Sequence, residues 1–177
     1  MEIYDLAIIG SGVGLTFVNP ALQMGWKTTL IEDTKLGGTC LTRGCIPSKV
    51  LIYPADLIRL VEHAKNVGLN FKLESFDWDL IEQRMWSQIN ESNDIEHGIR
   101  QAKSMGLDFY KGKAEFTDKY EMQVLLNETG EYTPKFKAKR IIIAAGCRTA
   151  IPPIKGIENV KYVTNETFFG PDFPKGK

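Results

Sequence analysis

The sequence predicts an α/β protein built around a parallel sheet. Two short apolar runs, Tyr4–Ile9 and Thr28–Glu32, have the pattern of buried strands on either side of a glycine-rich turn. Longer segments with apolar residues at helical spacing cover Ser48–Lys65 and Asp77–Met105, which predicts a helical hairpin. From Phe109 to Pro134 the pattern changes to short alternating runs separated by turns, which indicates a small antiparallel sheet.

The composition is that of a globular protein with no preference for a polyanion. The chain has 177 residues, with 22 basic and 22 acidic side chains. This balance gives no basic footprint for nucleic acid or for an anionic membrane. No apolar run reaches membrane length, and the apolar start is too short for a secretory signal. Three cysteines do not suggest a secreted disulfide scaffold, so we expect a cytoplasmic protein that binds neither nucleic acid nor membrane.

The first two apolar runs have the form of a βαβ unit with a nucleotide-binding turn. Gly10 and Gly12 follow the first run, where they permit a tight bend and close approach of the backbone to a pyrophosphate. Unpaired N–H groups at the start of the next helix would face that phosphate. Glu32, about twenty residues further on, is placed to accept a hydrogen bond from a ribose hydroxyl.

The turn departs from the G-x-G-x-x-G pattern in two ways. Leu15 stands at the third glycine position, with Gly14 one place early. Pro20 falls inside the expected helix, where a proline costs about 3 kcal/mol. We include Gly14 among the candidate nucleotide-binding residues and expect the helix to be kinked or closely repacked. Taken alone, this segment is also compatible with a purely structural glycine turn.

Two cysteines, Cys40 and Cys45, are the strongest chemical signal. In a regular helix their Cα atoms would be roughly 8.5 Å apart, beyond the ~7 Å limit for a disulfide. A bridge therefore requires a distorted turn, and Gly44, with the pair Gly37 and Gly38 upstream, tolerates unusual backbone angles. The alternative is that both cysteines are unpaired core residues.

The residues after the cysteines favour a reactive thiol. Pro47 suits the first turn of a helix, and Lys49 falls four positions beyond Cys45 on the same helical face. A helix start and a nearby ammonium group both stabilise a thiolate.

The segment from Gly37 to Lys49, with Gly-Gly-Thr-Cys followed by Cys-Ile-Pro-Ser-Lys, resembles the active-site segment of the flavin-dependent pyridine nucleotide-disulfide oxidoreductases. The resemblance implies a Rossmann-like FAD-binding domain and a redox-active disulfide between Cys40 and Cys45. It also implies that Cys45 lies nearer the flavin and forms the thiolate that interacts with it. Cys40 would form the mixed disulfide with substrate, and Lys49 would lie near the flavin and help to hold negative charge.

Other segments extend this resemblance. Arg140–Thr149 is similar to the family strand that ends in small residues against the flavin nucleotide, and Cys147 within it is expected to be a small buried residue. Gly112–Phe116 is similar to a segment whose backbone approaches the adenine, although a plain strand is also consistent with it. The cofactor-binding residues that the resemblance adds to the glycine turn and Glu32 are Gly38, Thr39, Lys49, Ala114, Ala145 and Gly146.

The resemblance also predicts how the chain is organised. Residues 1–150 are expected to be the amino-terminal part of an FAD-binding domain, and residues 151–177 a linker toward an absent NAD(P)-binding domain. The whole enzyme would then be a homodimer that exchanges electrons between NAD(P)H, FAD and a thiol or disulfide substrate, and the chain by itself would be catalytically incomplete.

The substrate is left open by the sequence. A dihydrolipoamide dehydrogenase-like enzyme acting on a small molecule or a lipoyl protein is the first hypothesis. Thr42 and Arg43 replace the Asn-Val pair common between the family's cysteines, so mercuric ion reductase and other thiol reductases are alternatives. A stand-alone flavin-binding or thiol-exchange module and a structural protein with an incidental cysteine pair are two further interpretations.

The remaining polar and aromatic candidates have simpler explanations. His63 and His97 are expected to be solvated, and the aromatic and methionine residues of the hairpin, among them Trp78, Met85 and Trp86, are expected to pack. A structural zinc site is not predicted, because no further closely spaced ligands accompany the cysteine pair.

Overall fold

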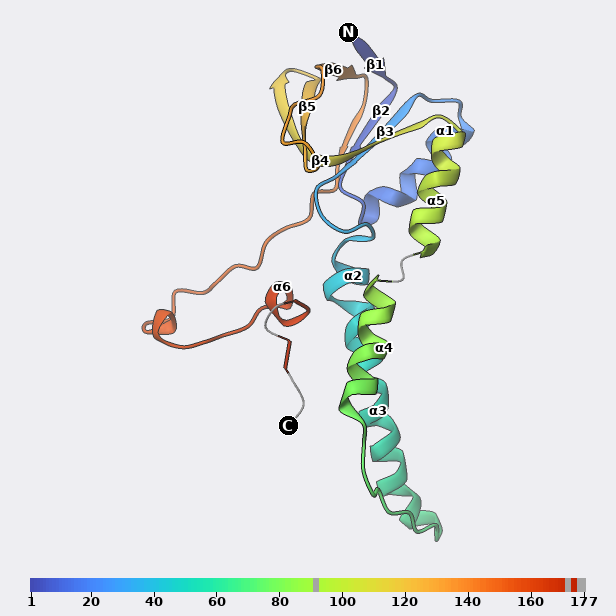
Figure 1. The fold of residues 1–177 in the computed structure, drawn as a ribbon, viewed down its shortest axis with the longest axis vertical. Coiled ribbons are helices and arrows are strands. Elements are labelled where there is room, and N and C mark those ends of the chain that lie inside the picture. Colours follow the sequence, from blue (N-terminus) through green and yellow to red (C-terminus); the bar gives the residue numbers. More distant parts are fainter. Residues whose placement is uncertain (91–92, 171–172, 175–177) are drawn as a thin grey trace. The chain divides into compact units, whose positions relative to one another are not determined.

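The computed structural model describes residues 1–90, 93–170 and 173–174 (Figure 1). The chain divides into two compact units. The first, here called the sheet unit, combines Met1–Thr39 with Ser92–Cys147. The second, the helical unit, combines Cys40–Glu91 with Arg148–Lys177. The predicted boundary between a domain at 1–150 and a linker at 151–177 stays a prediction.

The sheet unit contains a mixed sheet in which a parallel part continues into an antiparallel meander, as Figure 1 shows. The strand order in the described part of the chain is β1-β6-β5-β4-β3-β2-β7. The pairs β2/β3, β2/β7, β3/β4 and β1/β6 are parallel, whereas β4/β5 and β5/β6 are antiparallel. The strands are β1 (Glu2–Tyr4), β2 (Leu6–Ile9), β3 (Thr28–Glu32), β4 (Leu107–Asp118), β5 (Glu121–Leu126), β6 (Phe136–Ala138) and β7 (Ile141–Ile143).

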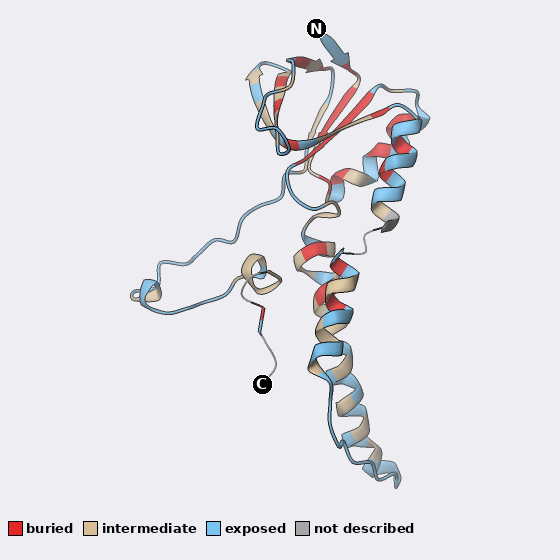
Figure 2. Ribbon diagram, in the orientation of Figure 1, coloured by how far each residue is buried: buried red, intermediate tan, exposed pale blue. Residues whose placement is uncertain are grey.

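Two hydrophobic clusters cover the two faces of the parallel strands. Helices α1 (Val18–Gln23) and α5 (Asn93–Ser104) pack on one face, where Leu22 and Ile99 meet Ile8 and Leu30. The meander packs on the other face, where Phe136 and Val124 join Ile31. Buried residues concentrate on β2 and β3 (Figure 2). The α/β fold class with a mostly parallel sheet, a Rossmann-like arrangement, is therefore confirmed.

Pro20 is accommodated by a change of helix type. A 3₁₀ turn, η1 (Val13–Phe17), precedes α1, so that Pro20 lies in the first turn of α1. Backbone N–H groups in a first turn have no intrahelical partner, and a proline there loses no hydrogen bond. The structure therefore shows a change from a 3₁₀ turn to an α-helix ahead of Pro20, and the expected kink or close repacking stays a prediction.

The first apolar run is divided at Asp5 into β1 and β2. The Asp5 carboxylate accepts hydrogen bonds from the Lys27 backbone N–H at 3.0 Å and from Lys139 Nζ at 2.7 Å. These contacts fix the point at which the chain passes from pairing with β6 to pairing with β3.

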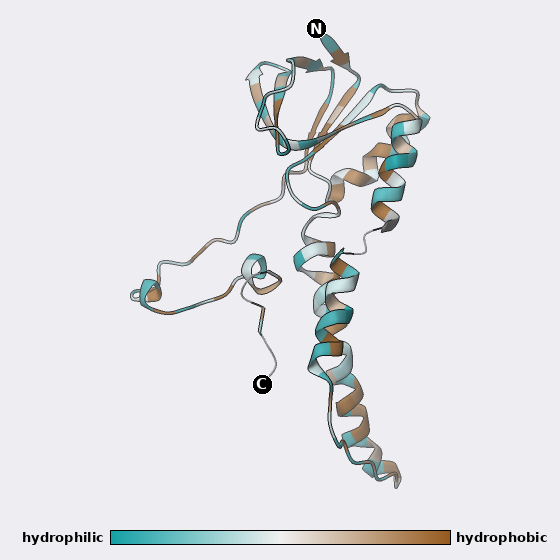
Figure 3. Ribbon diagram, viewed as in Figure 1, coloured by the Kyte–Doolittle hydropathy of each residue, from teal (hydrophilic) through white to brown (hydrophobic). Residues whose placement is uncertain are grey.

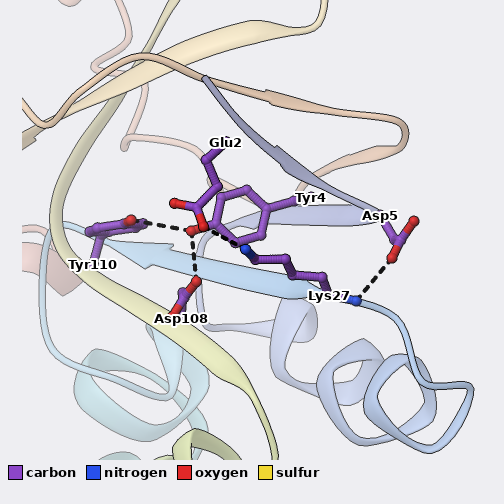
Figure 4. A network of polar contacts seen from close by, with 6 residues as sticks. All are labelled: Glu2, Tyr4, Asp5, Lys27, Asp108 and Tyr110. Carbon is purple, nitrogen blue, oxygen red and sulfur yellow. Dashed lines mark hydrogen bonds and ion pairs between the residues drawn. The ribbon is translucent and has the colours of Figure 1, made fainter.

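A polar cluster joins β1 to β4 at the amino ends of the parallel strands (Figure 4). The buried Tyr4 hydroxyl donates to Asp108 Oδ2 at 2.7 Å and lies 3.2 Å from the Tyr110 hydroxyl. Lys27 forms an ion pair with Glu2, and its ammonium lies 5.4 Å from the centre of the Tyr4 ring. Burial, with the bonds to Tyr110 and Asp108, raises the pKa of Tyr4, so this phenol stays protonated.

The helical unit is organised around α3 (Cys45–Ala64) and α4 (Trp78–Asn90). The buried residues Met85, Ile89 and Phe173 form its core, and the ring of Phe173 contacts those of Trp78 and Trp86. The predicted packing role of these aromatic and methionine residues is confirmed. The carboxyl-terminal half of α3 also contains hydrophobic residues, which are brown in Figure 3. The other short helices are α2 (Gly38–Arg43), η2 (Lys65–Val67), η3 (Ile157–Asn159) and α6 (Asn165–Phe168).

The second long helix of the predicted hairpin differs from the expectation. The segment Asp77–Met105 contains two helices, α4 in the helical unit and α5 in the sheet unit, with residues 91–92 between them outside the described part. Asn90 and Asn93 border this gap, and asparagine has low helix propensity. His63 and His97 are both exposed, as expected. Within the described ranges, no helix combines the length and the apolar character needed to cross a membrane.

Candidate functional site

The glycine turn lies where β2 ends, at the carboxyl edge of the parallel strands. Gly10 has a φ of +97°, and a Cβ there would lie 2.2 Å from the Ala144 carbonyl oxygen. Only glycine fits this position. Gly12 then precedes the first residue of η1, and among the described residues a Cβ there would meet the Gly38 Cα at 3.7 Å. The Gly12 backbone therefore lies close to Gly38, and the missing side chain leaves the start of η1 unobstructed in the direction that a Cβ would take.

Gly14 takes over the packing role of the absent third glycine. It is buried, and a Cβ there would lie 2.8 Å from Ile8 Cγ2 and 3.4 Å from Ala144 Cβ. A third glycine in this motif allows close packing of helix against strand. Because η1 is wound as a 3₁₀ turn, the glycine that faces β2 comes one residue earlier than in the usual pattern.

Glu32 ends β3 beside the glycine turn and is buried. Its Oε2 accepts from the Ser11 N–H at 2.8 Å and the Ser11 hydroxyl at 2.6 Å. Its Oε1 accepts from the Thr34 N–H and the Thr34 hydroxyl, both at 2.8 Å. Burial by itself raises the pKa of Glu32, but the four donors outweigh it and hold the pKa below its ordinary value. Glu32 is therefore ionised at neutral pH.

Ser11 joins the glycine turn to the segment that leads into α2. Its hydroxyl is completely buried and accepts a hydrogen bond from the Gly37 N–H at 3.1 Å. Gly38 has a φ of +63°, and a Cβ there would lie 2.6 Å from the Gly12 Cα. Sequence reasoning did not single out Ser11. Two features of the sequence could have identified it: its hydroxyl lies between Gly10 and Gly12, and the acidic Glu32 ends the next strand.

In the helical unit, Cys40 and Cys45 lie on either side of a break between two helices. α2 ends at Arg43, Gly44 has non-helical backbone angles, and α3 begins at Cys45. This is the distorted turn that the spacing required. Both cysteines are exposed free thiols, so the disulfide between them stays a prediction.

The Cys45 side chain affects the thiol of Cys40. The hydrogen bond with Cys45 raises the pKa of the Cys40 thiol, and the positive charge of Lys49 opposes that effect without cancelling it. The reduced pair therefore retains a proton on Cys40 at neutral pH. Lys49 is exposed, and its charge acts on Cys40. Its predicted role beside the Cys45 thiolate stays a prediction.

Replacing Cys45 with alanine is expected to accelerate alkylation of Cys40 at neutral pH, because loss of the hydrogen bond with Cys45 lowers the pKa of the Cys40 thiol and raises its reactive thiolate fraction. Lys49→Met is expected to slow the same reaction. The measurement is the iodoacetamide rate at Cys40 between pH 6 and 10, in the reduced protein with Cys147→Ser as background. An unchanged pH profile in Cys45→Ala would contradict the sulfur–sulfur interaction.

The remaining residues predicted to bind the cofactor are more exposed to solvent than the buried Gly14 and Glu32. Thr39 is exposed within α2, and Ala145 and Gly146 are exposed after β7. Ala114 packs its side chain against the second core cluster, so only its backbone is available to a ligand. Their roles toward a cofactor stay predictions.

The expectation that Cys147 is buried is wrong, because its thiol is exposed. The predicted strand over Arg140–Thr149 is regular only at Ile141–Ile143, with one further hydrogen bond from the Ala144 N–H to the Ile9 carbonyl. Gly146 then has a φ of +72°, and the chain leaves the sheet before Cys147.

The structure thus gathers the predicted residues into two groups. Gly10, Gly12, Gly14, Glu32 and Gly38 surround one turn of the sheet unit, and Cys40, Cys45 and Lys49 lie together in the helical unit. Within the described residues, no group of three or more His, Cys, Asp or Glu side chains could hold a metal ion.

The chain is similar to known proteins over most of its length. A family model described as pyridine nucleotide-disulphide oxidoreductase matches residues 4–169. A dihydrolipoyl dehydrogenase of Chlamydia muridarum is 34% identical over 146 residues, which are 82% of this chain and 30% of the relative. A glutathione reductase of Schizosaccharomyces pombe is 36% identical over 148 residues, which are 82% of this chain and 31% of the relative.

A third relative carries a different substrate in its name. A mercuric reductase of Lysinibacillus sphaericus is 32% identical over 171 residues, which are 93% of this chain and 29% of the relative. The chain therefore spans about three tenths of the length of these curated relatives.

Proposed function

The chain belongs to the pyridine nucleotide-disulphide oxidoreductase family, and from this premise we propose that it is the flavin-domain portion of an FAD-dependent disulfide reductase. Members of this family bind FAD and use NAD(P). The observation that carries the proposal is the thiol pair Cys40 and Cys45 across the helix break at Gly44, where a hydrogen bond joins the two side chains. The nucleotide turn of the sheet unit supports it independently.

The residues of the sheet unit fit a dinucleotide. The absence of a side chain at Gly12, at the start of η1, suits a pyrophosphate, and the ionised Glu32 suits a ribose hydroxyl. Gly10, Gly14 and Gly38 maintain the close contacts that shape this turn. When bound, FAD supplies a centre that accepts or donates two electrons. The proposed NAD(P) site lies in the part of the protein beyond this chain.

The cysteine pair performs thiol–disulfide exchange with substrate. Once the Cys40 thiol has lost its proton, its thiolate attacks one sulfur of a substrate disulfide. The other sulfur is released and takes up a proton, and a mixed disulfide is left on Cys40. The Cys45 thiolate then attacks Cys40 Sγ, releases the second substrate thiol and forms the Cys40–Cys45 disulfide. Two electrons pass to the substrate, and the two protons of the dithiol end on the two released thiols. Oxidation of a dithiol substrate is the reverse sequence.

For the whole protein, which we propose to be a homodimer, the first substrate to assay is dihydrolipoamide, on the basis of relatives named dihydrolipoyl dehydrogenase. Mercuric ion is a second candidate, because Cys40 and Cys45 are both exposed and thiolates bind soft metals. If the whole protein turned over mercuric ion but not dihydrolipoamide, mercuric ion would become the preferred substrate.

The function is tested by the visible absorption spectrum of the chain incubated with FAD and passed through gel filtration. We expect flavin absorbance with the protein, and a long-wavelength shoulder on anaerobic reduction with dithiothreitol. Cys45→Ala should abolish the shoulder, whereas Cys40→Ala, the matched control, should retain it. A folded chain that elutes without flavin, or a shoulder that is unaffected by Cys45→Ala, would contradict the proposal.

A further inference from the structure

Glu32 is surrounded by hydrogen-bond donors from the protein itself. A carboxylate offers about four acceptor positions on its two oxygens. Two donors from Ser11 occupy Oε2, and two from Thr34 occupy Oε1. A ribose hydroxyl can therefore bind Glu32 only by taking the place of one of these four donors.

The four donors differ in how easily they can leave. The N–H groups of Ser11 and Thr34 are fixed by the backbone. Ser11 is fully buried and its hydroxyl also accepts from the Gly37 N–H, so that withdrawing the hydroxyl would disturb one buried and one partly buried hydrogen bond. The Thr34 side chain is exposed, and its hydroxyl can rotate into water and be hydrated there.

We infer that the Thr34 hydroxyl is a placeholder, which occupies the position on Glu32 Oε1 that a ribose hydroxyl takes when the dinucleotide binds. The Ser11 hydroxyl stays in place and positions Glu32 in both states. This inference rests on the proposed function, because it requires a dinucleotide in the glycine turn. Both hydroxyls donate to Glu32, but the inference predicts opposite effects: the Thr34 hydroxyl weakens dinucleotide binding, and the Ser11 hydroxyl strengthens it.

The placeholder also explains how a buried carboxylate remains ionised without ligand. An unpaired buried charge is strongly disfavoured, and Oε1 with the Thr34 N–H as its sole partner would be less well satisfied. The exposed hydroxyl fills this position in the free chain and is replaced, donor for donor, by the ligand. The number of hydrogen bonds to Glu32 is then the same before and after binding.

The test measures binding of ADP, which carries the adenosine ribose and pyrophosphate of FAD, and of 2′,3′-dideoxy-ADP, by titration calorimetry. Thr34→Val removes the hydroxyl with little change of shape and is expected to tighten ADP binding about two- to tenfold, the range for loss of one competing hydrogen bond. It should leave dideoxy-ADP binding unchanged. Thr34→Ser should behave as wild type, and Ser11→Ala should weaken ADP binding about three- to tenfold.

Two results would overturn the inference while leaving the proposed function intact. One is weaker ADP binding by Thr34→Val, which would mean that the hydroxyl remains on Glu32 in the complex. The other is an equal shift for ADP and dideoxy-ADP, which would mean that the ribose hydroxyls are not involved. A wild-type chain with a folded circular dichroism spectrum that binds neither FAD nor ADP would overturn the proposed function together with this inference.

Discussion

Replacing Gly10 with alanine is expected to lower the free energy of unfolding of the sheet unit by about 3 kcal/mol or more. The left-handed backbone at φ +97° is unfavourable for alanine by about 1–2 kcal/mol. In addition, the new Cβ would lie 2.2 Å from the Ala144 oxygen, and overpacking of this kind costs typically about 1–3 kcal/mol. Ala144 cannot move freely, because its N–H donates to the Ile9 carbonyl at 2.7 Å. Urea denaturation followed by circular dichroism measures the loss.

Gly25 provides the matched control for this substitution. Its φ is +71°, and a Cβ there would meet no atom of the described residues within 4 Å. Gly25→Ala should therefore show the backbone penalty alone, about 1–2 kcal/mol. If Gly10→Ala and Gly25→Ala lose the same stability, the close contact between Gly10 and Ala144 is not present in solution.

Local patterns in the sequence were enough to predict the strands that carry the glycine turn. The apolar run before Gly10 and the run that ends at Glu32 form β2 and β3 as expected, since both are buried and continuous. The short strand β1 was not separated from β2, because its partner β6 lies more than 130 residues away in the chain. Such non-local pairing leaves no local periodicity.

The hydrogen bonds within the site were harder to predict from the sequence than the residues that form the site. Ser11, Glu32 and Gly37 meet only when the chain is folded, so the hydrogen bonds among them have no signature at a fixed spacing. The turn-forming role of Gly44 was predictable, because the spacing of Cys40 and Cys45 is incompatible with a bridge inside a regular helix. The exposure of Cys147 was not, because it depends on where pairing with β2 stops.

The second large effect is expected at Glu32, where Glu32→Gln should lower the free energy of unfolding at neutral pH by about 2–4 kcal/mol. Glutamine has one acceptor oxygen in place of two, and its NH₂ group must face donors from Ser11 or Thr34. The hydroxyls can turn to accept, but a backbone N–H cannot, so one N–H loses its partner. The expected loss of about 2–4 kcal/mol combines two costs: the loss of a hydrogen bond to a charged acceptor, and a backbone N–H donor that is left without a partner.

The same variant is expected to change how stability depends on pH. Because the pKa of Glu32 in the folded chain lies below the ordinary value of 4.5, the unfolded chain takes up the proton first as the pH falls. The stabilisation is complete above pH 4.5 and is lost as the pH falls through the folded pKa, at up to about 1.4 kcal/mol per pH unit. Glu32→Gln should lack this acid-dependent loss, whereas a substitution of the exposed Glu128 by glutamine should retain it. Parallel curves for wild type and Glu32→Gln in urea denaturation between pH 3 and 7 would mean that the four donors do not hold the carboxylate in its charged form.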